Sequence, residues 1–280
     1  MRQYLCAFLT FGLVACGDTP ERQEKAGEAP SVTRAALTFD GALNRDPQAQ
    51  LAHGERMSWM FGCKGCHGED LQGANVTEKD PEFGDMNASN LTLLLPQYSD
   101  ADIERVVRQG IPKDGREFWF MPSESFQYMS DADLAALIVY LRTIKPAGKQ
   151  MPPIRKGPLF HKQVEDKTFT HARAMVERYR KSQPTDLGKD HALGRHIAIT
   201  VCAECHNSEL QGYEGFTPDL DIAGAYSDDE LKTLLATGRG KAKADLGLMT
   251  KTSQSRFSKF TPRERDAVAA YLKARANRAQ

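Results

Sequence analysis

The sequence has no apolar run long enough to cross a bilayer. Its longest such stretch, residues 5–15, has 11 residues, whereas a spanning helix needs about 20. A run of this length shortly after Met1-Arg2 is typical of the hydrophobic region of a secretory signal peptide. The chain also lacks net charge, with 37 basic and 37 acidic side chains. This balance excludes the broad basic surface of a nucleic-acid-binding protein.

Strand patterns are missing as well. No run alternates convincingly between apolar and polar residues, and apolar residues recur at helical spacing instead. A mean hydropathy of −0.52 argues against a polytopic membrane protein. The length of 280 residues suffices for about two domains. We therefore expect an all-α protein with two small domains.

Cysteine is scarce, and each of the six residues has an assignment. Cys6 lies in the expected signal peptide, residues 1–15. Cys16 ends the run Leu13-Val14-Ala15-Cys16, which resembles the lipobox of bacterial lipoproteins, where this cysteine carries the lipid. The alternative is an ordinary signal peptide with a coincidental cysteine. Residues 16–50 are polar and aperiodic, which predicts a flexible tether.

The other four cysteines form one pentapeptide pattern twice and leave no thiol for a disulfide. The two copies are Cys63-Lys64-Gly65-Cys66-His67 and Cys202-Ala203-Glu204-Cys205-His206. Two thiols at this spacing can add to the two vinyl groups of a haem, and the adjacent imidazole then reaches the iron. A redox-active dithiol or one zinc site built from both pairs are alternatives, but neither explains a histidine after each pair.

The chain also repeats outside the cysteines. Residues 70–73 and 209–212 both end in Leu-Gln-Gly, with the glycine seven residues beyond the second cysteine of each motif. Helices are expected at 51–61 and 193–201, before the motifs. Further helices are expected to begin after Ser99, Ser130, Ser227 and Thr261, because these residues have the sequence pattern of helix N-caps.

These motifs and repeats resemble the class I cytochrome c fold in tandem, as in dihaem cytochrome c lipoproteins and cytochrome subunits of bacterial dehydrogenases. The resemblance implies cytochrome c domains at 51–148 and 188–280, joined by a connector at 149–187 with one short helix near 169–179. It also implies two covalently bound haem c groups. The cofactor-binding residues would be Cys63, Cys66, Cys202 and Cys205, with His67 and His206 as iron ligands.

The second axial ligand is expected to be a methionine in each half. Met249 is the one methionine after His206. In the first half Met86, Met121 and Met129 compete, and the repeat selects Met121, which follows Tyr98 by 23 residues as Met249 follows Tyr226. The family pattern of methionine followed by proline fits Met121 and not Met249.

Other polar residues have weaker assignments. Among the spare histidines, His53 and His196 are expected at the surface or behind the ligands. By resemblance, residues 90–92 and 219–221 would lie by the haem propionates, and Tyr98 and Tyr226 near the porphyrin or in the core. Charged residues that flank the methionine loops, Arg105, Arg108, Lys113, Arg239, Lys241 and Lys243, would steer a partner, pair with propionates or simply lie on exposed helix ends.

The connector is the basic part of the chain. Residues 149–185 carry 9 basic and 3 acidic side chains, whereas residues 51–148 carry 9 and 15. A solvated linker is one interpretation. The other is that the connector docks on the acidic first domain, fixes the distance between the haems and makes their electron exchange sensitive to salt.

Two filled axial positions leave no place for a substrate on the iron, so the resemblance implies an electron carrier and not an enzyme. Electrons would pass from a dehydrogenase or quinol-oxidising complex towards a cytochrome or oxidase, on the periplasmic face of a bacterial membrane, where a lipid holds the protein. The alternatives are a dihaem oxidoreductase, such as a peroxidase or thiosulfate dehydrogenase, and a fixed subunit of a larger assembly.

Overall fold

The computed structural model describes residues 37–278. The expected signal peptide and the expected lipid site Cys16 lie outside the described residues. Within 37–278, no helix combines the length and the apolar character needed to span a membrane.

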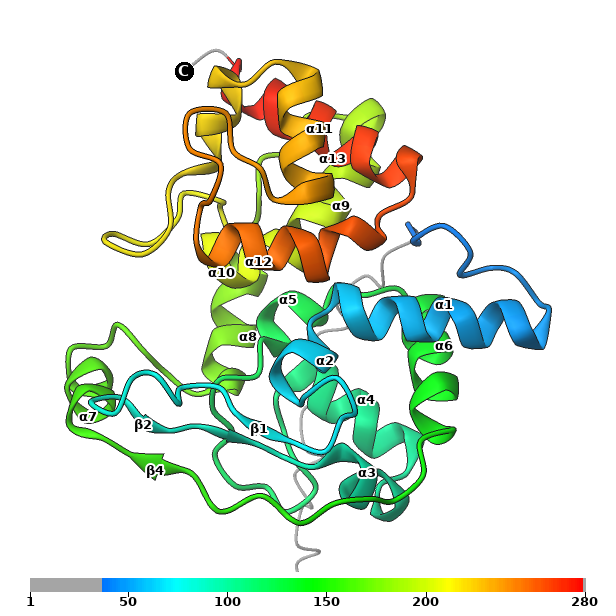
Figure 1. Cartoon of the computed structure of the whole chain (residues 1–280), viewed down its shortest axis with the longest axis vertical. Coiled ribbons are helices and arrows are strands. Elements are labelled where there is room, and N and C mark those ends of the chain that lie inside the picture. Colours follow the sequence, from blue (N-terminus) through cyan, green and yellow to red (C-terminus); the bar gives the residue numbers. More distant parts are fainter. Residues whose placement is uncertain (1–36, 279–280) are drawn as a thin grey trace, which may run out of the picture. The chain divides into compact units, whose positions relative to one another are not determined.

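The first half is a group of helices with three very short strands, two of which pair with each other (Figure 1). Strand β1 pairs with β3 in antiparallel register, Ala74 opposite Ala88. The elements are α1 (Pro47–Met60), α2 (Cys63–Cys66), β1 (Ala74–Asn75), β2 (Gly84–Asp85), β3 (Asn87–Ala88), α3 (Leu91–Leu94), η1 (Leu95–Gln97), α4 (Asp100–Gln109), α5 (Ser123–Phe126) and α6 (Asp131–Arg142).

The connector is folded and not a bare linker. It contains β4 (Arg155–Lys156), α7 (Pro158–Glu165) and α8 (Ala172–Lys181). Strand β4 pairs antiparallel with β2 of the first half, Gly84 opposite Lys156. The helix expected near 169–179 corresponds to α8, whereas α7 was not expected.

The second half repeats the helical plan without a strand pair of its own among the described residues. A π-helical turn, η3, leads into the second cysteine motif, and single π turns of this kind are frequent at functional sites. The elements are η2 (Lys189–His191), α9 (Ala192–Ile197), η3 (Ala198–Cys202), α10 (Ala203–His206), η4 (Leu220–Ala225), α11 (Asp228–Thr237), α12 (Leu248–Ser255), η5 (Phe257–Lys259) and α13 (Pro262–Ala276).

The helix starts expected from the sequence are confirmed. Ser99 and Ser227 cap α4 and α11 with complete capping boxes, and each helix ends at a left-handed glycine, Gly110 or Gly238. Ser130 caps α6, and Thr261 caps α13. The all-α class is confirmed as well, because the strands are only two residues long.

Each half brings its first and last helices into contact at a glycine. Gly54 of α1 lies against the backbone of Ala136 in α6, and Gly194 of α9 lies against Ala267 in α13. A β-carbon at either glycine would come within 2.0 or 2.1 Å of a carbonyl oxygen. The two close helix crossings therefore depend on the absence of a side chain at these positions.

We predict that Gly194→Ala destabilises the protein by about 1–3 kcal/mol, which is the usual cost of overpacking a core. The new methyl group would displace α13 from α9, and chemical denaturation of the haem-loaded protein measures the change. Gly65→Ala is the control, because the space around Gly65 is open. Equal stability of the two variants would contradict this account of the helix crossing.

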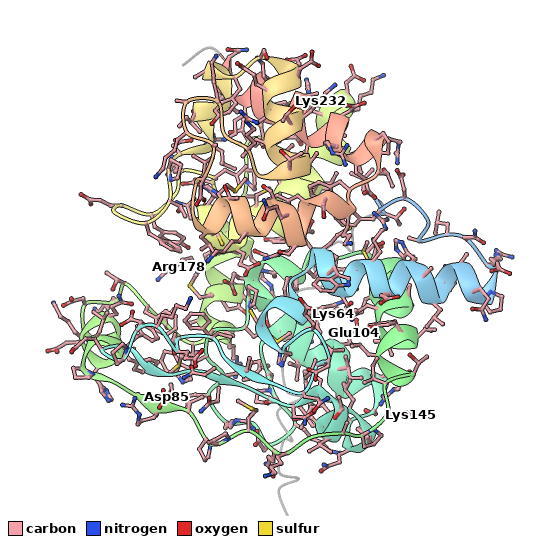
Figure 2. The ribbon with its side chains drawn as sticks, viewed as in Figure 1. Lys64, Asp85, Glu104, Lys145, Arg178 and Lys232 are labelled. Atoms are coloured by element: carbon pink, nitrogen blue, oxygen red, sulfur yellow. The ribbon has the colours of Figure 1, made fainter. Side chains whose placement is uncertain are left out.

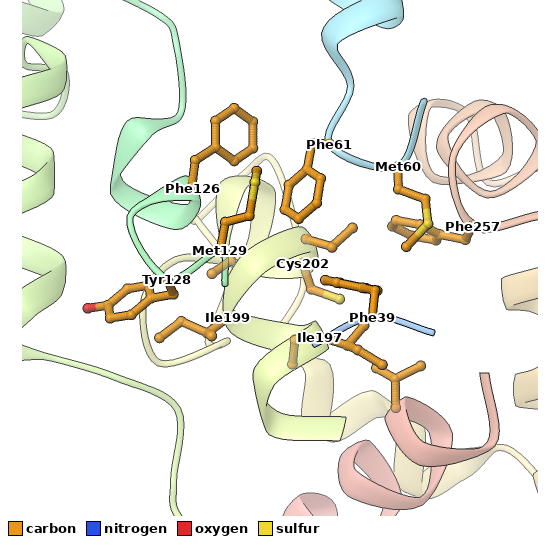
Figure 3. Packing of buried hydrophobic residues seen from close by; sticks show 14 of the residues in the cluster. Phe39, Met60, Phe61, Phe126, Tyr128, Met129, Ile197, Ile199, Cys202 and Phe257 are labelled. Atoms are coloured by element: carbon orange, nitrogen blue, oxygen red, sulfur yellow. The ribbon is translucent and has the colours of Figure 1, made fainter. Parts of the chain in front are cut away.

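A shared hydrophobic core joins the two halves (Figure 3). Phe39 is 1% exposed and packs against Phe61, directly after α1, and against His196 of α9, with ring centroids 5.6 and 5.7 Å apart. The Phe39 amide also donates to the Asp133 carboxylate, at 3.2 Å. Residues 39–50 are therefore not part of a flexible tether, because apolar burial of Phe39 holds the segment and α1 begins at Pro47.

Candidate haem-binding sites

The first cysteine motif forms a single helical turn, α2, between a left-handed glycine and His67. Gly62, with φ 72°, precedes Cys63, and the His67 amide donates to the Cys63 carbonyl at 2.8 Å. The His67 ring donates through Nδ1 to the Ser89 carbonyl at 2.7 Å. Because a carbonyl can only accept, Nδ1 carries the proton and Nε2 keeps a free lone pair.

The second motif holds its histidine in the same way. His206 donates through Nδ1 to the Pro218 carbonyl at 2.9 Å. Burial lowers the pKa of both His67 and His206, so both rings are neutral near pH 7. A neutral imidazole with one nitrogen bonded to a carbonyl presents the other nitrogen to a metal, which is the arrangement that an axial iron ligand requires.

The Leu-Gln-Gly repeat closes the loop behind each histidine. The Gly73 and Gly212 amides donate to the His67 and His206 carbonyls, at 2.7 and 2.8 Å. Both glycines have positive φ, 93° and 80°, which a residue with a side chain rarely adopts. The repeat found in the sequence therefore has one structural role in both halves: it fixes the chain around the ring.

A cavity of about 1410 Å³ adjoins the first motif. Typical small-molecule pockets are about 300–1,000 Å³, so this cavity has room for a group as large as a porphyrin. Cys63, Cys66, His67 and Met121 all line it. The four residues that the sequence assigned to the first haem are thus gathered around one space.

The other methionines of the first half lie differently. Met129 is 1% exposed and belongs to the hydrophobic core. Met86, between β2 and β3, lines the cavity, and so does Met151, which sequence analysis missed because it falls in the connector. Its signal was available, since Met151 precedes Pro152 as Met121 precedes Pro122.

Met121 remains the stronger ligand candidate. Met151 packs on Gly73, where an added β-carbon would lie 2.3 Å from its Cγ. Gly73 is bonded to the His67 carbonyl, so Met151 contacts the loop that follows the histidine. Met121 has the spacing of the repeat, and its assignment as the sixth ligand stays our prediction.

In the second half, the four assigned residues are Cys202, Cys205, His206 and Met249, and two of them pack in the shared core. Cys202 is buried in the shared core, where Figure 3 shows its side chain near Phe39 and Ile197. Met249 lies in the first turn of α12 and packs against the same core. Met121, in contrast, lies in a loop before α5. The two methionine segments therefore differ in backbone structure, and Met249 also stays a prediction.

The thiols do not have the properties of a redox-active dithiol. Burial raises the pKa of Cys63, Cys202 and Cys205 to about 12 and that of Cys66 to about 11. Catalytic dithiols need a lowered pKa. Among residues 37–278, no group of three or more His, Cys, Asp or Glu is arranged to hold a metal ion, which also disfavours the zinc alternative.

The connector completes the first site. Residues 150–154 and Lys156 line the cavity, and Asn87 donates to the Pro153 carbonyl at 3.2 Å. At the β2–β4 seam, Arg155 donates to Asp85, labelled in Figure 2, at 2.7 Å. The connector therefore does dock on the first half. This ion pair is exposed, so water screens it already and any salt sensitivity of the docking should be small.

An aromatic cluster anchors the connector beside the cavity. Phe83 and Trp119 of the first half pack on Phe160 and Phe169 of the connector, with ring centroids 4.9 to 5.6 Å apart. Such pairs contribute about 0.5–1.5 kcal/mol each beyond their buried area. Apolar packing, and not charge, provides most of the attachment.

The spare histidines are not iron ligands of the first site, because the cavity is lined by other residues. His53 and His196 are 4% and 5% exposed, so of the two expected places, at the surface or behind the ligands, the surface is excluded. The His53 Nε2 atom pairs with Asp133 at 2.8 Å. Burial lowers the pKa of His196 to about 4, which keeps its ring neutral.

The residues expected near the propionates act as helix caps. Asn90 accepts from the Thr92 amide at 3.0 Å and donates to the Ala147 carbonyl at 2.8 Å, which joins the first half to the chain leading into the connector. Asp219 accepts from the Asp221 amide and from Arg275, both at 2.8 Å. Asn90 and Tyr98 also line the cavity, which is compatible with the expected contact.

The charged residues around the methionine loops have mainly structural contacts. Arg108 is 7% exposed and donates to the Met129 carbonyl at 2.5 Å, and Arg105 pairs with Asp102 at 3.0 Å. Lys113 lines the cavity, and its Nζ donates to the Gln97 carbonyl at 2.9 Å. Lys241 pairs with Glu230 at 3.1 Å.

A buried carboxyl group lies three residues after Met121. Burial, and to a lesser extent the negative charge of Glu204, raises the pKa of Glu124 to about 8. The unfolded chain has its ordinary value near 4.5. Between these two values the folded protein binds one proton more than the unfolded chain, so stability falls as the pH rises from about 4.5 to 8.

We predict that Glu124→Gln removes this loss of stability. In the wild-type protein the free energy of unfolding should decrease by up to about 1.4 kcal/mol per pH unit from this group. Denaturation midpoints at pH 5 and pH 8 measure the effect. Glu177→Gln, on an exposed face of α8, is the control and should keep the wild-type slope. An unchanged slope in Glu124→Gln would contradict the prediction.

Two helical domains, each with a Cys-X-X-Cys-His turn and a carbonyl-held histidine, define a protein built to bind haem c. Comparison with known proteins supports this conclusion. The family model for cytochrome c matches the chain twice, over residues 51–145 and 191–276. The chain therefore belongs to the cytochrome c family.

Two curated proteins are similar to the chain. One is a nicotinate dehydrogenase subunit of Pseudomonas putida, which is 32% identical over 124 residues that cover 40% of this chain and 10% of that protein. The other is the gluconate 2-dehydrogenase cytochrome c subunit of Pantoea cypripedii, which is 22% identical over 285 aligned positions that cover 85% of this chain and 62% of that protein. The chain thus spans less than two thirds of either relative.

Proposed function

We propose that this chain is a dihaem c-type cytochrome that passes electrons between redox proteins outside the cytoplasm. The observation that carries the proposal is the repeated histidine geometry: His67 and His206 are both neutral and both bonded through Nδ1 to a backbone carbonyl. Each would present Nε2 to one iron. Cys63 and Cys66 would hold the first haem, and Cys202 and Cys205 the second.

Haem iron, when bound, supplies a one-electron couple between the ferrous and ferric states. The residues of this chain then decide what that couple can do. Met121 and Met249 would fill the sixth positions, exclude small substrates and raise the potentials, because a thioether favours ferrous iron. Apolar side chains such as Leu91 and Ile103 line the first cavity and would limit the access of water to the iron. Such a protein carries electrons and does not catalyse a reaction by itself.

A dehydrogenase is the electron donor that the comparisons favour. The relative that covers most of this chain is named as the cytochrome c subunit of a dehydrogenase. By this analogy electrons would enter from a dehydrogenase or a quinol-oxidising complex and leave to a cytochrome or oxidase. Whether the chain is a free carrier or a fixed subunit is decided by copurification from membranes.

Electron transfer is tested with the purified full chain, matured with its haems. We expect rapid reduction of both haems by membranes that contain a sugar-acid dehydrogenase and its substrate, and reoxidation by a cytochrome or oxidase. Omission of the substrate is the control. Rapid turnover of hydrogen peroxide or thiosulfate by the cytochrome alone would instead favour the dihaem oxidoreductase.

Export and lipid attachment are part of the proposal and rest on the sequence. Residues 1–15 have the pattern of a signal peptide, and Cys16 has that of a lipid-carrying cysteine. We expect Cys16→Ala to move the protein from the membrane to the soluble periplasmic fraction, with its haems retained. Membrane attachment that survives this change and resists high salt would contradict the anchor.

A further inference from the structure

Arg256 connects the two haem-binding motifs. It ends α12 in the second half, and its Nη2 donates to Glu204 at 2.9 Å. Glu204 lies between the two cysteines of the second motif. The Nε of Arg256 donates to the Met60 carbonyl at 2.8 Å, at the end of α1 in the first half. One side chain therefore contacts both halves.

The contact reaches the first motif itself. Gly62 directly precedes Cys63, and a β-carbon on Gly62 would lie 3.1 Å from Cζ and Nη1 of Arg256. Glu204 of the second motif lines the cavity of the first site. The charge pair thus lies between the two motifs: Glu204 belongs to the second motif and borders the first cavity, and Arg256 lies against Gly62 beside the first motif.

The pair is largely shielded from water. The Arg256 and Glu204 side chains are 11% and 20% exposed. Although burial lowers the pKa of Arg256, the adjacent Glu204 carboxylate raises it overall, so the guanidinium stays charged. Both charges also act on the pKa of all four thiols, Glu204 raising it and Arg256 lowering it, after the effect of burial.

A second contact, made by the connector, holds the Cys-X-X-Cys segment of the second motif. Tyr179 of α8 is 1% exposed, and its hydroxyl donates to the Ala203 carbonyl at 3.1 Å. The Tyr179 carbonyl in turn accepts from Tyr128 at 2.6 Å. The two residues between Cys202 and Cys205 are therefore each bonded to another part of the chain, Ala203 to the connector and Glu204 to Arg256.

We propose that Arg256 and Glu204 form a positioning pair that holds the two haem-binding motifs against each other and sets the potentials of both haems together. This inference rests on the proposed dihaem function. Oxidation of an iron adds a positive charge, so an unpaired carboxylate nearby favours the oxidised form and an unpaired guanidinium the reduced form. While the pair is intact, the two effects largely cancel at both sites.

Three variants of the full haem-loaded chain test the proposal by redox titration. We expect Arg256→Gln to lower both midpoint potentials and Glu204→Gln to raise both. The change in the reduction equilibrium should be about tenfold, which is about 59 mV for one electron. The double variant should return close to the wild-type potentials while inter-haem electron transfer slows, because the contact between the motifs is lost.

Arg56→Gln is the matched control. Arg56 of α1 also joins the halves, through Glu264 of α13 at 2.8 Å, but it contacts neither cysteine motif through this pair. Arg56→Gln should lower the free energy of unfolding and leave both midpoint potentials unchanged. The proposal is overturned if Arg256→Gln shifts one haem only or neither, or if Arg56→Gln shifts them equally. Failure of the dihaem function itself would be visible beforehand, as fewer than two haems in the wild-type protein.

Discussion

Replacement of Cys202 and Cys205 by alanine should yield a protein with one covalently bound haem in place of two. The remaining haem would be held by Cys63 and Cys66, which line their own cavity with His67. The second half should also lose stability, because the buried environment of Cys202 then lacks the group around which it folds. Mass measurement of the intact chain, together with the haem spectrum after denaturation, counts the covalent groups.

The reciprocal pair, Cys63→Ala with Cys66→Ala, should likewise leave one haem. Cys6→Ala is the control, since Cys6 belongs to the expected signal peptide and should not affect the count. The two single-haem proteins should have different spectra and potentials. Two haems retained in either paired variant would contradict the assignment of the cysteines.

Met121→Leu should remove the thioether ligand of the first haem and lower its potential by on the order of 100 mV or more. Axial ligands shift haem potentials over a range of about 0.8 V, and loss of the soft sulfur weakens the preference for ferrous iron. The absorption band of methionine-to-iron charge transfer should fall by half, because the second haem would keep its proposed ligand Met249. Leucine has a similar volume, so the packing around the cavity should change little.

Met151→Leu is a demanding control for this prediction. Met151 lines the same cavity and is also followed by proline, but it packs on Gly73 in the loop that follows His67. It should leave the charge-transfer band intact. A band halved in Met151→Leu and unchanged in Met121→Leu would reverse the assignment and make the connector the source of the ligand.

Local signals in the sequence predicted much of the fold. Helix N-caps such as Ser99 and Ser227 act through their own neighbours, so their positions could be predicted without any tertiary information. The cysteine motifs are equally local, and so are the Leu-Gln-Gly loops that follow them. The repeat of these features along the chain was enough to predict two similar domains.

Features made by distant parts of the chain could not be predicted in this way. The burial of Phe39 depends on α1 and α9 together, and it corrected the length of the tether. The path of the connector over the first cavity follows from the β2–β4 pairing, and this brought Met151 into the site. Arg256 is one of many arginines in the sequence, and only its distance to Glu204 distinguishes it.

In the function proposed here, two haem irons, each with a histidine and a methionine ligand, exchange electrons within one chain. A potentiometric titration of the purified full-length protein, followed by absorption spectra, tests it most directly. We expect two one-electron steps, two haems per chain and low-spin iron with methionine ligation throughout. A single step from a single haem, or a high-spin iron with an open sixth position in the resting protein, would contradict it.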